Sequence, residues 1–176
     1  MTLTVEDGTG LANADALVAL VDVDAYHTAR GNSTWTGDDA DKETAIRRAS
    51  FFLTNSYSWQ GFKVNNRDQA LAWPRTGVVD QEGYAIPITE VPQEIKDACA
   101  ELALRELTTP GTMTPDVTLA DKVNREKVGE IEVEYANSRM DAYASRPVVT
   151  IVNDLIAQFL ATGSQAGSVA GSTVRA

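Results

Sequence analysis

The side chains that most often carry chemistry are scarce in this chain. His27 is the only histidine and Cys99 the only cysteine, so one chain cannot assemble a multi-histidine metal site or a cysteine-based zinc site. His27 is thus the single candidate for a Ser-His or Cys-His pair, but its helical setting beside Tyr26 favours a structural or solvated role. Cys99 falls on the apolar stripe of an expected helix, where a cysteine usually behaves as an inert small hydrophobe.

The acidic residues and glycines point to no reaction either. General acid–base catalysis needs a geometry and shifted pKa values that no spacing of the 25 carboxylates predicts. Asp38, Asp39 and Asp41 are typical of a helix start. The glycines fall singly at turns, without the spacing of a phosphate-binding loop. We therefore expect neither enzyme activity nor a cofactor.

One stretch combines cations with aromatic residues. Between Thr44 and Val79 the chain has five basic residues and a single acidic one, a local excess of four positive charges. Aromatic rings that stack on bases, beside cations that contact phosphates, are the means by which proteins bind single-stranded nucleic acid. The candidate contacts in this stretch are Tyr57, Trp59, Phe62, Arg67 and Arg75.

The same stretch also has a structural interpretation. Its aromatic residues can form core, and its arginines can form a solvated face or a contact between subunits. We favour this interpretation because Phe52 has a packing role on a predicted helix and Trp73 has one in the predicted connector. Both interpretations remain open from the sequence.

Composition limits the class of protein. A chain of 176 residues, 43% of them hydrophobic, suffices for one core, and we expect one domain over residues 1–162. The net charge of −10 argues against wrapping duplex DNA on a broad basic face. No apolar run is long enough for a transmembrane helix and the start lacks the pattern of a signal peptide. We expect a soluble protein that is not exported and has no membrane partner.

Helical periodicity predicts a mainly α protein, a small bundle of about four helices. Apolar residues recur at three- and four-residue steps in each segment. The predicted helices span residues 21–30, 39–56, 93–107 and 147–162. Residues 1–14 read as an extended arm that turns before the first helix and could pack on a neighbouring subunit.

A fixed connector precedes the third helix. Prolines follow Trp73, Ile86 and Val91, so these three residues should be extended. Holding such a connector in one conformation costs entropy, and burial of an aromatic ring can offset that cost. We expect Trp73, with Pro74 and Arg75, to anchor an ordered connector.

The last third of the chain changes pattern. Apolar and polar residues alternate over residues 126–135 around Gly129-Glu130, which predicts a β-hairpin. Because an isolated hairpin is marginal in water, we expect it to join a sheet elsewhere in the chain or in a neighbouring copy. The tail of residues 163–176 consists of small residues that cannot build a core, so we expect it to be disordered in solution.

Several segments together resemble one protein family. They are Leu3 to Gly10, Asp24 to Asn32, Leu71-Ala72-Trp73-Pro74-Arg75-Thr76-Gly77, Val91-Pro92 with Ala98 to Leu104, and Lys122 to Tyr135. The chain resembles the small head-tail connector (adaptor) proteins of tailed bacteriophages, often labelled DnaT-like single-stranded-DNA-binding proteins. The resemblance reaches from the start to about residue 160.

The resemblance implies a mainly helical protein that forms a ring, typically a dodecamer, beneath the portal. Its partners would be the portal protein, neighbouring copies, a stopper or tail-completion protein, and the packaged DNA that passes through the channel. Such proteins send a C-terminal segment into the portal. That role would fall here on Gly163, Ser164, Val169, Val174, Arg175 and Ala176.

The leading hypothesis is therefore a structural adaptor in the virion neck, made in the bacterial cytoplasm. A negative charge suits a channel through which DNA slides, since a basic lining would retain phosphates. The alternative is a single-stranded-DNA-binding protein that uses the basic aromatic stretch 44–79.

Overall fold

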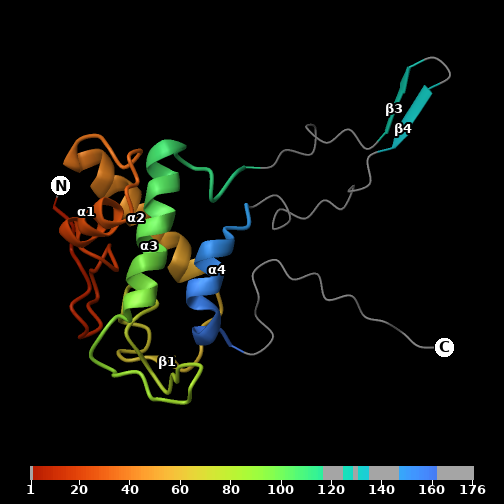
Figure 1. Cartoon of the computed structure of the whole chain (residues 1–176). Helices are drawn as coiled ribbons and strands as arrows, with labels where there is room; N and C mark the ends of the chain where they lie inside the picture. Colours follow the sequence, from red (N-terminus) through yellow and green to blue (C-terminus); the bar gives the residue numbers. More distant parts are fainter. Residues whose placement is uncertain (1, 117–124, 129–130, 135–146, 162–176) are drawn as a thin grey trace, which may run out of the picture.

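Four α-helices pack together in the computed structural model, which describes residues 2–116, 125–128, 131–134 and 147–161 (Figure 1). The helices are α1 (Leu20–Ala29), α2 (Asp39–Ser56), α3 (Gln93–Thr108) and α4 (Thr150–Ile156), and the short 3-10 turn η3 (Ala157–Phe159) continues α4. Helix α3 is central, because it contacts α1, α2 and α4. The prediction of a mainly α bundle is confirmed.

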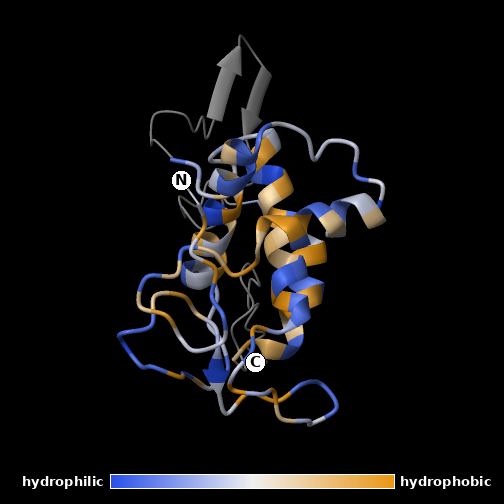
Figure 2. Ribbon diagram, turned by 90° about the vertical axis from the view of Figure 1, so that its left-hand side faces the viewer, coloured by the Kyte–Doolittle hydropathy of each residue, from blue (hydrophilic) through white to orange (hydrophobic). Residues whose placement is uncertain are grey.

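Helices α2 and α3 form the main packing pair, and their boundaries match the predicted ones closely. The Asp38 side chain caps α2 by accepting a hydrogen bond from the Asp41 backbone N–H at 2.9 Å. Figure 2 shows polar and apolar residues alternating along the helices. The predicted apolar stripes of the two helices are buried as Ala45, Ile46, Ala49, Phe52, Leu53, Ile95, Ala98, Cys99, Leu102 and Ala103.

Helix α4 is shorter than predicted. Helical structure begins at Thr150 and not at Pro147, because Val149 has an extended conformation. After η3 the chain leaves the helix to bond with the segment that follows α2, where Gln60 N–H donates to Phe159 O and Ala161 N–H donates to Ser58 O. Val152, Ile156 and Phe159 are buried as expected, whereas Val148 and Ile151 are exposed. The apolar periodicity of residues 147–162 predicts that Val148 and Ile151 share the buried face, and this prediction is wrong.

The first residues fold back onto their own chain. Val5 forms a parallel bridge with Ala16, and the buried Glu6 carboxylate accepts hydrogen bonds from the N–H groups of Gly8, Gly10 and Leu11. A Cβ atom at Gly8 would lie 1.9 Å from the carbonyl oxygen of Thr89. The segment expected to be an extended arm is therefore packed within the subunit, because a buried anion gathers its backbone N–H groups.

Two small antiparallel sheets complete the described structure. Strands β3 (Arg125–Val128) and β4 (Ile131–Glu134) pair with Val128 opposite Ile131, so the predicted hairpin is confirmed one residue earlier than expected. Among the described strands they pair only with each other. Strands β1 (Phe62–Lys63) and β2 (Arg75–Thr76) were not predicted, and their pairing closes a loop of residues 64–74 that contains Trp73.

The connector is held by an aromatic cluster. Trp73 is fully buried, and its ring lies edge-on to Trp59 at 5.7 Å and to Phe159 at 5.4 Å between centroids. Among the buried side-chain N and O atoms of the described residues, only Trp73 Nε1 lacks a hydrogen-bond partner. The peptide bond between Trp73 and Pro74 is cis. The cluster joins the connector to the end of α2 and to η3.

Candidate nucleic-acid interface

The two tryptophans of the basic aromatic stretch are not available for stacking on bases. Trp59 is 8% exposed and Trp73 is 0% exposed. Trp59 also donates its Nε1–H to the Leu53 carbonyl oxygen at 3.2 Å. Stacking requires an open ring face, so neither ring can bind a base without opening the aromatic cluster.

Tyr57 has a similar structural role. Its ring lies between Phe52 and Trp59, with centroid distances of 6.0 and 5.7 Å. Its hydroxyl donates to Asn153 Oδ1 at 3.0 Å, which links the end of α2 to α4. Burial raises the pKa of Tyr57 to about 12, so the hydroxyl remains a neutral donor at physiological pH.

The basic side chains nearest these rings bind backbone carbonyls. The Arg75 guanidinium donates to the carbonyl oxygens of Gln60 at 2.6 Å, Gly61 at 2.7 Å and Ala72 at 3.1 Å. Lys63 Nζ donates to the Gln69 carbonyl oxygen at 3.0 Å. Burial lowers the pKa of both cations. These charges stabilise the turns around β1 and β2 and are poorly placed to contact phosphates.

Two of the candidate contacts do face solvent. Phe62 on β1 is 75% exposed, and Arg67 lies exposed in the following turn. The structure therefore divides the candidate set. Tyr57, Trp59 and Arg75 belong to the fold, while Phe62 and Arg67 remain accessible to a ligand.

A surface hollow beside α2 contains a further aromatic and basic pair. Phe51 is 64% exposed, and it lines a hollow of about 710 Å³ with Arg47, Arg48, Asn55, Leu71, Met113 and others. We call this the Phe51 hollow. The helical pattern indicates only that Phe51 is exposed, because it falls outside the apolar stripe of α2. No motif in the sequence predicts a site there.

The charges of the Phe51 hollow are largely neutralised in place. Arg47 Nε donates to Asp15 Oδ2 at 2.7 Å. The deeply buried Glu106 carboxylate accepts from the Gly111 and Met113 N–H groups and lies 3.8 Å from Arg48. The Arg48 side chain is 49% exposed and Glu106 only 3%. Arg48 is therefore the most exposed of the four charged side chains that line the hollow, and it is paired with Glu106.

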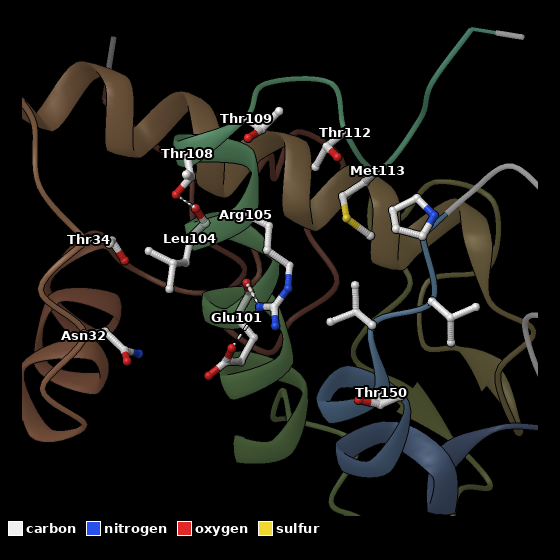
Figure 3. A pocket seen from close by; sticks show the side chains of 13 residues that line it. Asn32, Thr34, Glu101, Leu104, Arg105, Thr108, Thr109, Thr112, Met113 and Thr150 are labelled. Atoms are coloured by element: carbon white, nitrogen blue, oxygen red, sulfur yellow. Dashed lines mark hydrogen bonds and ion pairs between the residues drawn. The ribbon is translucent and has the colours of Figure 1, made fainter.

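A second hollow of about 680 Å³ lies between α3 and the residues that precede α4 (Figure 3). Its polar lining includes Glu101, Arg105, Thr108 and Thr112. The Glu101 carboxylate accepts from Tyr26 Oη and from Arg105 at 2.9 Å each. These groups satisfy one another, so the charges in this hollow hold α1 to α3.

His27 and Cys99 both lie inside the bundle. The His27 ring nitrogens contact the Ala100 carbonyl oxygen at 3.1 Å and the Asn32 side-chain nitrogen at 3.0 Å. This arrangement fits a neutral ring that donates from Nε2 and accepts at Nδ1. Cys99 is fully buried 3.3 Å from Ser50 Oγ, and burial raises the pKa of its thiol to about 12. Both residues act as packing groups.

The part of the chain that the structure describes contains no candidate metal site and no membrane-spanning helix. Within those ranges no group of three or more His, Cys, Asp or Glu side chains could hold a metal ion. No helix there is long and apolar enough to cross a membrane. The residues expected to bind the portal, from Gly163 to Ala176, lie outside the described ranges.

Fold and site define a small, mainly helical protein whose basic and aromatic residues are largely built into its own packing. The chain belongs to the family described as "Putative DnaT-like ssDNA binding protein", whose model matches residues 1–176. That description names single-stranded DNA and does not name a phage connector. No curated protein and no solved structure matches the chain.

Proposed function

We propose that this protein is a structural head-tail adaptor of a tailed bacteriophage. It forms a ring below the portal, extends the DNA channel and docks the next neck or tail protein. Its place in the virion would be the head-tail interface. The proposal rests on the sequence resemblance to head-tail adaptors together with the internal use of the basic aromatic stretch.

The observation that carries the proposal is the set of bonds made by Arg75 and Trp59. A dedicated single-strand groove needs open aromatic faces beside accessible cations. Here Trp59 and Trp73 are buried, and Arg75 donates to three backbone carbonyls. The aromatic and basic content of this stretch is therefore explained by folding, which supports an assembly role over a DNA-binding one.

The net charge of the chain also supports an adaptor role over DNA binding. The chain has a formal net charge of −10, and phosphate binding depends on accessible Lys and Arg. An acidic ring would let packaged DNA pass without retaining it.

Cryo-electron microscopy of intact particles tests the proposal. We expect a ring between portal and tail whose subunits match the arrangement of α2, α3 and α4. Particles in which this position is filled by another protein, with the chain absent, would refute the proposal. If the proposal is refuted in this way, capsids from a phage lacking this gene should also assemble a normal neck.

Binding to single-stranded DNA is the second candidate function, and the family description favours it. Phe62 and Arg67 are the predicted contacts that remain exposed. An oligonucleotide titration at low salt should then show binding that weakens as salt is raised. Phe62→Ala with Arg67→Ala should abolish this binding.

The control for that titration is Val21→Ala, because Val21 is 70% exposed on α1, away from the basic aromatic stretch. An unchanged affinity in the Phe62 and Arg67 variant would exclude those residues as the site. Lack of binding by the unmodified protein at low salt would remove this candidate function.

A further inference from the structure

The loop between β2 and α3 exposes apolar side chains that the fold does not need. Within residues 78–90, Val79 is 42%, Tyr84 69% and Ile88 50% exposed. We call this segment the 78–90 loop. Figure 1 shows it at the end of the molecule where α3 begins. Exposed apolar residues this close together on one loop can form a surface that binds another protein.

Backbone bonds give the 78–90 loop a fixed shape without help from those side chains. Asp80 Oδ1 accepts from the N–H groups of Glu82 at 2.9 Å and Tyr84 at 2.8 Å. Ile86 N–H donates to Val78 O at 3.0 Å, and Gln81 N–H donates to Gln158 Oε1 at 3.1 Å. A preformed loop loses little entropy on binding, so the loop is suited to dock as a rigid element.

The loop is also acidic. From Thr76 to Ile95 the sequence contains Asp80, Glu82, Glu90 and Glu94 and no Lys or Arg. Glu82 and Glu90 are exposed. A complementary surface would therefore combine an apolar cavity with an accessible cation.

The Phe51 hollow has this combination. Phe51 and Leu71 line it, and so does Arg48, which is half-exposed although it is paired with Glu106. Its volume of about 710 Å³ lies in the range of cavities that admit an aromatic ring with neighbouring aliphatic groups. Both complementary surfaces thus occur on the same chain.

The 78–90 loop and one wall of the Phe51 hollow lie toward opposite ends of α3. The 78–90 loop leads into the first turn of α3, whereas Glu106 and Met113 of the hollow lie at and beyond its last turns. The 14 residues from Gln93 to Glu106 correspond to roughly 20 Å of helix. Contact between different surfaces of identical copies is a heterologous interface, and such interfaces generate rings when the rotation closes.

We propose that the 78–90 loop of one copy docks into the Phe51 hollow of the next copy, with Tyr84 and Ile88 entering the hollow and Glu82 facing Arg48. This inference rests on the proposed ring-forming function and assigns its subunit contact. The described fold leaves both surfaces open in a single copy.

Cross-linking tests this contact directly. The full chain carrying Phe51→Cys and Tyr84→Cys is treated with a short bismaleimide, both as free protein and in portal-containing particles. Cys99 does not interfere, because it is fully buried with a pKa raised to about 12. We expect a ladder of covalent oligomers that forms at least about tenfold faster than with Val21→Cys and Tyr84→Cys, as a local increase in effective concentration requires.

Equal rates for the two variants in both preparations would overturn the proposed contact. Mixing provides an independent readout, because Tyr84→Ser removes the loop side chain and Phe51→Ser alters the hollow. Each variant alone should lose the assembly seen with the unmodified chain, while an equal mixture should give heterodimers and no larger species. Mixed samples that form full-size assemblies would contradict a heterologous contact.

Failure of this contact can be separated from failure of the proposed function. A ring of this chain in particles without the cross-linked ladder would retain the adaptor function and remove the contact. Cross-linked oligomers from a chain that is absent from particles would retain the contact and remove the adaptor function.

Discussion

Three carboxylates, Glu6, Glu101 and Glu106, are almost fully buried, and each accepts hydrogen bonds that fix one segment. Glu6 orders the first residues, Glu101 links α1 to α3 through Tyr26, and Glu106 closes the turn after α3. A buried charge is costly unless it is paired or hydrogen-bonded. These three glutamates therefore stabilise the folded protein from the inside, although the acidic composition alone would suggest that they lie on the surface.

Glu6→Ala tests the role of the buried carboxylate. It leaves three backbone N–H groups without their acceptor, so we expect the free energy of unfolding to fall by about 2–4 kcal/mol. Urea denaturation measures this change. The neighbouring Asp7→Ala is the control, because Asp7 is exposed and binds only Thr9. Equal effects of the two variants would contradict the assigned role of Glu6.

His27 makes the stability depend on pH. Burial lowers its pKa below 6.5 in the folded state. At acidic pH the imidazole therefore binds a proton more readily in the unfolded chain than in the folded one. The free energy of unfolding should therefore decrease as pH falls below about 6.5. His27→Gln should reduce this slope between pH 7 and 5 in denaturation titrations. An unaltered slope would show that His27 does not supply it.

At Gly61, a close approach of two backbone segments restricts which residue can occupy the position. Gly61 has a φ of 61°, and a Cβ atom there would lie 2.0 Å from the Thr76 carbonyl oxygen. This close approach brings the turn before β1 against β2. Gly83 in the 78–90 loop also has a positive φ, of 92°, but a Cβ atom there has no neighbour within 4 Å.

Gly61→Ala should therefore destabilise the protein more than Gly83→Ala. Both variants incur the strain of a positive φ, about 1–3 kcal/mol, and only Gly61→Ala adds the collision with Thr76. We expect an additional loss of about 1–3 kcal/mol, measured by thermal or urea unfolding. A difference near zero would mean that the β1–β2 contact shifts at little cost.

For the molecule as a whole, the helices and the proposed portal-attachment segment occupy different parts of the chain. The four helices and η3 lie within residues 20–159. In the proposed adaptor, portal attachment falls on residues 163–176. Folding and attachment should therefore respond to different changes.

Deleting residues 163–176 should leave the fold intact and prevent attachment to the portal. Circular dichroism and urea unfolding of the shortened chain should match those of the full chain. Sedimentation with portal-containing heads should show loss of binding. Shortened protein that joins such heads normally would disprove the role of this segment.

Local patterns in the sequence predicted the helices and the hairpin. Helix periodicity and end signals depend on residues three or four positions apart, so α1, α2 and α3 agree with the predicted ranges within one residue at each end. Alternation over a few residues likewise located β3 and β4. For these elements the interactions that specify the structure lie within the element itself.

Contacts between residues far apart in the sequence determine where the last helix ends and which aromatic and basic side chains are buried. The bonds of Phe159 to Gln60 and of Ala161 to Ser58 end the last helix early, and the carbonyls that bind Arg75 lie up to 15 residues away. Local pattern therefore could not separate the buried Trp59 from the exposed Phe62, nor reveal the hollow around Phe51. The accessibility of an aromatic or basic side chain depends on which segments, distant in the sequence, cover it. Only the tertiary packing determines which segments those are.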